Sequence, residues 1–130
     1  MNQRFIELGE GYSDIFELRE IIERNRDRLQ HLLLLKTDIN GKNRCSFAVI
    51  LKPTPTGNFQ PIYICKEGIP YEEAKPNQRL EFFQEMAAKA NQEIIELEVK
   101  ASRSFAEDTL YYQYLIGILR MNRYILPLNW

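Results

Sequence analysis

The sequence predicts an α+β domain with a mostly antiparallel sheet, helices packed on that sheet, and elements in the order β-α-β-β-β-α-β-α. Two short apolar runs, residues 32–35 and 47–51, flank an Asn-Gly pair and read as a hairpin. Amphipathic helical patterns precede and follow this hairpin, and residues 93–101 alternate between apolar and charged side chains. At 130 residues the chain fits one domain, residues 1–130.

The first strand and the first helix are predicted at the start of the chain. Residues 4–8 alternate like a strand, and Gly9 and Gly11 interrupt that pattern. Ser13 or Asp14 can then cap a helix, and Asp14 with Glu17 fits a capping box. The apolar positions of this helix follow helical spacing: Ile15, Leu18, Ile21, Ile22 and Leu29.

The central hairpin can be registered from its turn. Asn40 and Gly41 suit a two-residue type I′ turn, because both central positions of that turn need a positive φ. This register sets Leu34 opposite Phe47 and makes both faces of the hairpin apolar. A hairpin with one wet face would alternate apolar with polar residues, so we expect helices or a second subunit to cover both faces. A third strand, residues 61–66, follows a proline-rich loop.

The second half of the chain predicts a helix, an edge strand and a final helix. Asn77 can cap the first of these helices, and Asn91 can end it in the left-handed conformation. Its apolar stripe contains Leu80, Phe83, Met86, Ala87 and Ala90. One face of residues 93–101 is charged, which is typical of a strand at or near a sheet edge.

The last helix is predicted over residues 105–124, with Ser104 and Glu107 as its capping box. Its apolar residues surround most of its girth, so we expect it to be buried on more than one side. The apolar tail, residues 125–130, ends in Trp130 and should dock on the domain or on a neighbour, because large apolar side chains are costly to leave in water.

Composition excludes several function classes. The chain has 17 basic and 18 acidic residues, so no global field favours nucleic acid or an anionic membrane. The sequence shows neither a signal peptide nor an apolar stretch of the ~18 residues that a membrane span needs. Two cysteines without a disulfide framework suggest a reducing compartment, and we expect the cytoplasm.

The sequence predicts no catalytic residue, metal site or cofactor. His31 is the one histidine, and no ligand spacing accompanies it. Cys45 and Cys65 do not form a Cys-x-x-Cys pair and fit buried structural thiols better than nucleophiles. Glycine-rich phosphate loops, nucleophile elbows and HExxH motifs are absent from the sequence.

The surplus of apolar surface predicts a non-catalytic protein-interaction domain, chaperone- or adaptor-like, that acts as a homodimer and can hold a protein partner. The expected interface residues lie on the last helix and the tail: Tyr111, Tyr114, Leu115, Ile118 and Trp130.

The alternative is a small-molecule binding protein or enzyme with a site between the loops 53–61 and 68–76. The residues expected to line that site are Tyr63, Tyr71, Glu72 and His31.

Two resemblances bear on these expectations. The stretches Arg4-Phe5-Ile6-Glu7-Leu8-Gly9-Glu10-Gly11-Tyr12 and Phe59-Gln60-Pro61-Ile62-Tyr63-Ile64-Cys65 are similar to those of short uncharacterised proteins from Bacillus-type bacteria. From the first helix onward, the element order resembles the small dimeric chaperones of type III secretion, although the opening strand departs from it. That resemblance implies a helix-and-sheet surface for partners and no catalytic centre.

Overall fold

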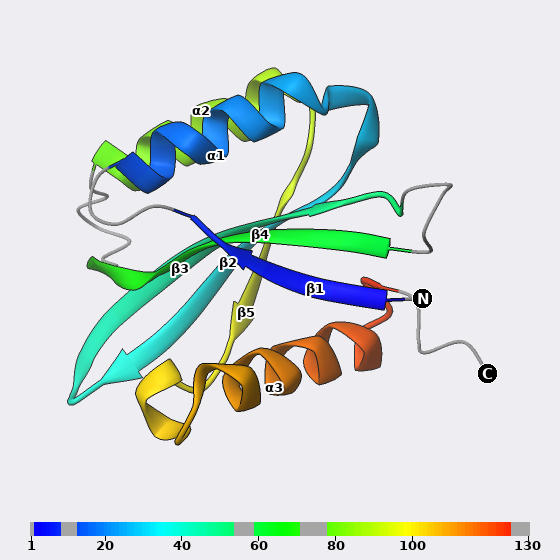
Figure 1. Ribbon diagram of the computed structural model, residues 1–130. Coiled ribbons are helices and arrows are strands. Elements are labelled where there is room, and N and C mark those ends of the chain that lie inside the picture. The colour runs from blue at the N-terminus through cyan, green and yellow to red at the C-terminus, as the bar shows by residue number, and fades with distance from the viewer. Residues whose placement is uncertain (1, 9–12, 54–58, 71–77, 126–130) are drawn as a thin grey trace.

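One mixed sheet lies between two helical layers (Figure 1). The structure is a computed structural model, in which residues 2–8, 13–53, 59–70 and 78–125 are described. In this part of the chain the sheet has five strands, in the spatial order β1-β4-β3-β2-β5. The strands are β1 (Asn2–Glu7), β2 (Leu29–Ile39), β3 (Lys42–Leu51), β4 (Phe59–Pro70) and β5 (Ile94–Glu98). The helices are α1 (Ser13–Arg24), α2 (Gln78–Lys89) and α3 (Asp108–Met121), with short 3₁₀ turns at Arg26–Arg28 and Ser102–Ser104.

The expectation of a mostly antiparallel sheet was wrong, because the sheet is mixed. β2 pairs antiparallel with β3, and β3 pairs antiparallel with β4, as consecutive strands joined by short connections do. The two outer strands pair in parallel, β1 with β4 and β5 with β2. Helix α1 connects β1 to β2 and α2 connects β4 to β5, and in each case the helix returns the chain so that the two strands run in the same direction.

The central hairpin has the predicted register. Asn40 and Gly41 have φ values of 53° and 80°, and Leu34 lies opposite Phe47. Leu32, Leu34 and Phe47 point to the face that α1 and α2 cover, whereas Leu33 and Leu35 point to the face that α3 covers. Helices of the same chain therefore cover both apolar faces of the hairpin, and no second subunit is needed for that purpose.

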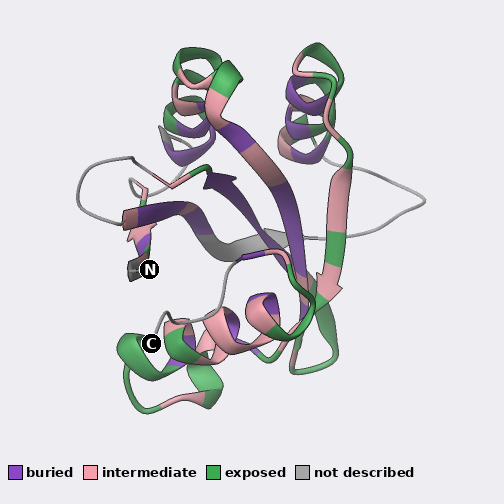
Figure 2. Ribbon diagram, turned by 90° about the vertical axis from the view of Figure 1, so that its right-hand side faces the viewer, coloured by how far each residue is buried: buried purple, intermediate pink, exposed green. Residues whose placement is uncertain are grey.

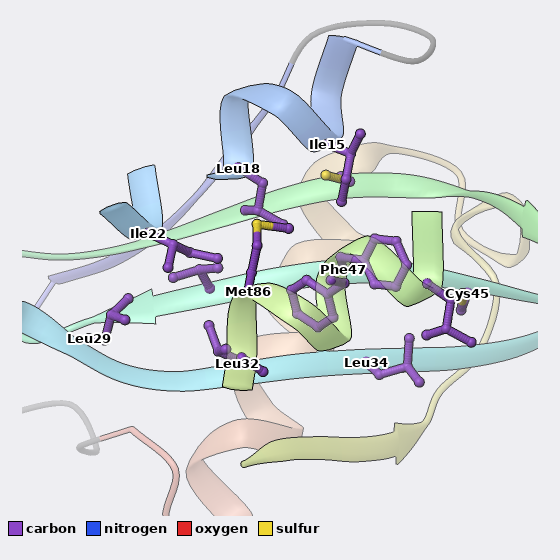
Figure 3. Packing of buried hydrophobic residues seen from close by; sticks show 14 of the residues in the cluster. Ile15, Leu18, Ile22, Leu29, Leu32, Leu34, Cys45, Phe47 and Met86 are labelled. Carbon is purple, nitrogen blue, oxygen red and sulfur yellow. The ribbon is translucent and has the colours of Figure 1, made fainter. Parts of the chain in front are cut away.

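Each face of the sheet carries its own core. Figure 2 shows buried residues on the inner sides of all three helices and along the central strands. Figure 3 shows residues of the upper core, where Ile15, Leu18 and Ile22 of α1 and Met86 of α2 lie together with side chains of the central strands. In the lower core, Tyr111, Leu115 and Leu119 of α3 pack on the other face of the same strands. These α3 residues are four apart in sequence, so they share one side of the helix.

Several predicted boundaries move in the structure. Leu29 begins β2 instead of extending the first helix, and β4 runs from Phe59 to Pro70, beyond both ends of the predicted strand. The capping box expected from Ser104 does not form: Ser104 belongs to a 3₁₀ turn, and α3 begins after Glu107, whose side chain makes no cap hydrogen bond. Asn91 has a φ of 55° after α2, as predicted.

Candidate functional site

The amino-terminal ends of α1 and α2 are tied together by a buried ion pair. β1 and β4 run parallel, so the chain leaves both strands at the same end of the sheet, where both helices begin (Figure 1). In the first turn of α1, Asp14 is only 6% exposed, and its carboxylate pairs with the Arg79 guanidinium from the first turns of α2. The pair fixes the relative positions of the two helices at this end.

Two free thiols lie in the core beneath this pair. Burial raises the pKa of Cys65 far above its usual range, and the nearby Asp14 charge and a hydrogen bond to that carboxylate act in the same direction. Burial raises the pKa of Cys45 to about 12, although the positive charge of Arg79 opposes the shift. Both thiols stay protonated at neutral pH, so neither is a ready nucleophile or metal ligand.

A second contact joins α1 and α2 at their other ends. Arg26, in the 3₁₀ turn after α1, donates from Nη2 to the backbone oxygen of Lys89 at 3.1 Å. That oxygen is one of the carbonyls that a helix end leaves without an intrahelical partner. Because α1 and α2 are held at both ends, their outer surface is a preformed feature of the domain.

An aromatic pair with an arginine lies on the outer surface of the two helices. Phe16 of α1 is 53% exposed, and its ring meets that of Phe82 of α2 edge-on, at a centroid distance of 5.7 Å. The guanidinium carbon of Arg19 lies 5.8 Å from the Phe16 centroid and 5.4 Å from the Phe82 centroid. Cations favour this position near ring faces. The contact holds Arg19 across the junction of the two helices.

A shallow groove continues from this cluster along the junction. We call it the α1–α2 groove, and it is lined by Arg19, Ile22, Glu23, Arg26, Phe82, Glu85, Met86 and Lys89. Ile22 and Met86 are buried and form its floor, while charged side chains of both signs form its rim. Its volume is about 60 Å³, far below the roughly 300–1,000 Å³ of small-molecule pockets. An apolar centre within a polar rim is the arrangement found at protein–protein interfaces.

The structure separates two of the residues predicted to line a loop site. Tyr63 of β4 packs with the core under α1 and α2. His31 of β2 lies on the opposite side of the sheet, where its ring is 5.3 Å from that of Tyr124. These two side chains do not face a common pocket. Tyr71 and Glu72 lie outside the described residues.

The residues predicted to form an interface on α3 have different surroundings. Tyr111 and Leu115 are 3% and 1% exposed and belong to the lower core, so they contact the chain's own sheet. Tyr114 and Ile118 are half-buried, and the Tyr114 hydroxyl accepts a hydrogen bond from the Lys100 amide. Trp130 lies outside the described residues.

The girth of α3 is covered because several elements surround it. On one flank Tyr112 stacks on Phe5 of β1, with centroids 5.0 Å apart, and its hydroxyl donates to Glu7. On the other flank Phe105 lies 5.1 Å from the Tyr114 ring. The large apolar side chains of α3 that remain exposed are Leu110, at 45%, and Met121, at 84%.

Sequence reasoning missed the main features of the α1–α2 groove. Phe16 lies outside the apolar stripe of its helix, and single exposed apolar residues are common on protein surfaces, so its contact with Phe82 had no sequence signal. The pairing of Asp14 with Arg79 had no sequence signal, since the two residues are 65 positions apart.

The described residues form neither a metal-binding cluster nor a membrane-spanning helix. The described residues contain no group of three or more His, Cys, Asp or Glu side chains arranged to hold a metal ion. None of the helices in the described ranges has the length and apolar character of a membrane span.

No curated protein and no solved structure matches the chain. A family model described as "Domain of unknown function (DUF7147)" matches residues 1–125, and the chain therefore belongs to this family.

Proposed function

We propose that this chain is a non-catalytic, adaptor- or chaperone-like protein-interaction domain, and that the α1–α2 groove with the Phe16 side chain is its docking surface. We place it in the cytoplasm, since two free thiols suit a reducing compartment. The observation that carries the proposal is a surface cluster of the exposed Phe16 and Arg19 with the half-buried Phe82, beside an apolar floor. Aromatic residues and arginine are enriched at the energetic centres of protein interfaces.

The energetics of Phe16 support this assignment. Its ring is more than half exposed, and a polar residue could replace it without opening the core. The exposed ring is therefore not required for the packing of the domain. Burying the exposed half of this ring against a partner contributes about 1 kcal/mol, half of what a fully exposed ring would gain. The surface is also rigid before binding, because the Asp14–Arg79 pair and the Arg26–Lys89 contact hold both helices. A preformed surface loses little conformational entropy on association.

Site-specific photo-crosslinking in cells that naturally make the protein tests the proposal. A photoreactive residue replaces Phe16 in one variant and Leu110 in the matched control, which is 45% exposed on α3, on the other side of the sheet. We expect discrete adducts from position 16 and none from position 110. Adducts from position 110 alone would move the docking surface to α3, and the absence of adducts from both positions would contradict the proposed function.

A further inference from the structure

The exposed side of α1 carries a series of aromatic, acidic and basic residues, and this series can be compared with the same series running in the opposite direction. Starting from the amino-terminal end, the order is Phe16, Glu17, Arg19, Glu20, Glu23 and Arg24, followed by Arg26 and Asp27 in the 3₁₀ turn. All eight residues are exposed, and the aromatic residue and Arg26 stand towards opposite ends of the series.

Reversing this order places opposite charges next to each other. If a second α1 lies antiparallel on the first, with the two-fold axis near residue 21, then Arg19 meets Glu23 and Glu17 meets Arg24. The aromatic end at Phe16 then meets the cationic end at Arg26, which allows a cation–π contact between the copies. A parallel arrangement would instead put every charge beside its own like, which is unfavourable.

Helix α2 has the same polarity and reinforces the pattern. Phe82 lies beside Phe16 near the start of the groove, whereas Lys89 lies beside Arg26 at its end. In the antiparallel arrangement, Lys89 of each copy therefore approaches the Phe82 end of the other. The aromatic end of the whole two-helix layer is complementary to its cationic end.

We propose that the partner of the α1–α2 groove is a second copy of this chain, docked through a two-fold axis that runs across the helices so that α1 of one copy lies antiparallel on α1 of the other. This inference rests on the proposed function and names its partner. An isologous contact must be complementary to itself, and the reversed charge order meets that condition.

The size of the surface sets the expected strength of the dimer. Each helix has 12 residues and is about 18 Å long, so the contact lies at the small end of specific interfaces, below ~1,200 Å² in total. The dimer should therefore be weak and in rapid exchange, with association visible at tens of micromolar. Because it depends on exposed charges, it should weaken as salt concentration rises.

Charge-swap variants test the pairing directly. Arg19→Glu makes the surface acidic and Glu23→Arg makes it basic, and each change turns two symmetric attractive contacts into repulsive ones. We expect each variant alone to dimerise roughly tenfold more weakly than the natural chain. An equimolar mixture of the two should recover association as a heterodimer, which loss of folding in either variant could not produce. Sedimentation equilibrium of the full chain reads out the mass against 15.4 kDa for one copy.

Glu20 supplies a variant with the opposite expected effect. It lies next to the proposed axis and would face its own copy, so it contributes the one like-charge contact among the α1 residues in this pairing. Glu20→Gln should strengthen the dimer about twofold, because it removes that repulsion. Arg24→Glu should weaken it, because Arg24 would then repel Glu17 of the other copy.

The outcomes separate this inference from the proposed function. A mixture that remains at one-copy mass while each variant is folded by circular dichroism overturns the second-copy pairing. If position 16 still crosslinks in cells, to a protein of different mass, the docking surface stands and only the identity of its partner is wrong. If the natural chain dimerises but both charge variants dimerise equally well, the copies meet through another surface and the inference fails.

Discussion

The stability losses from removing each partner of the Asp14–Arg79 pair singly should add up to more than the loss from removing both. The Asp14 side chain is 8% exposed and the Arg79 side chain 19% exposed, so Asp14→Ala leaves a largely buried guanidinium without its carboxylate. Breaking one side of a buried pair typically costs about 3–5 kcal/mol. Because Arg79 keeps some contact with water, we expect the low end, about 3 kcal/mol. Arg79→Met should cost a similar amount by leaving Asp14 uncompensated.

The double variant separates charge burial from simple loss of packing. With both charges gone, Asp14→Ala together with Arg79→Met should be at least 2 kcal/mol more stable than the sum of the single effects predicts, a threshold of about that size being typical of coupled buried pairs. Urea unfolding measures all four proteins. With a slope of about 1.5 kcal/mol/M, each single change should lower the unfolding midpoint by about 2 M.

A surface pair of the same chain provides the control. Arg19 and Glu23 approach to 4.0 Å, but their side chains are 44% and 61% exposed. Glu23→Ala should therefore change the free energy of unfolding by no more than about 0.5 kcal/mol. Single Asp14 or Arg79 variants that lose under 1 kcal/mol, or a double variant whose loss is the sum of the two, would refute the reasoning about this pair.

Three further predictions concern the core and its titratable groups. Leu115→Ala should lower the free energy of unfolding by about 2–5 kcal/mol because it opens a cavity under α3, whereas Leu110→Ala, at a 45% exposed position, should cost far less. Cys45 should resist alkylation at pH 8 in the native protein and react on unfolding. The free energy of unfolding should fall as pH rises from 9, the ordinary pKa of a cysteine thiol, towards the native pKa of about 12, because only the unfolded thiol ionises in that range. Burial lowers the pKa of His31 from 6.5, and a hydrogen bond with the Tyr124 backbone opposes this shift more weakly. The free energy of unfolding should therefore fall as pH drops below about 6.5, because the unfolded imidazole binds a proton more readily than the folded one. His31→Gln should reduce that loss in urea titrations at pH 5 and 7.

Local sequence signals predicted the centre of the fold well. The Asn40-Gly41 turn determines the hairpin register through the backbone geometry of two adjacent residues, so no distant information was needed. Side chains of Leu32 to Leu35 point alternately to the two faces of the sheet, so both faces had to be covered by other elements, and the helices cover them. Short-range geometry and the period of the apolar pattern were sufficient for this part of the molecule.

The features that could not be predicted from the sequence depend on contacts between residues far apart in the chain. β1 pairs with β4, more than fifty positions away, and the sequence of neither strand indicates its pairing partner. The apolar girth of α3 suggested an interface because its neighbours were unknown, whereas the sheet, Phe5 and Phe105 cover most of it within one chain. The exposed Phe16 is a single aromatic residue on an otherwise charged side of α1, so its contact with Phe82 had no local sequence signal.

If the molecule associates through the outer face of α1 and α2, a dilution series followed by amide NMR shifts will locate the contact on these two helices. As the concentration rises to hundreds of micromolar in low salt, the amides around Phe16, Arg19, Glu23 and Phe82 should shift together, while those of Leu110 and Met121 on α3 stay constant. Shifts confined to α3, or amides on α1 that do not move while sedimentation shows a dimer, would contradict the account.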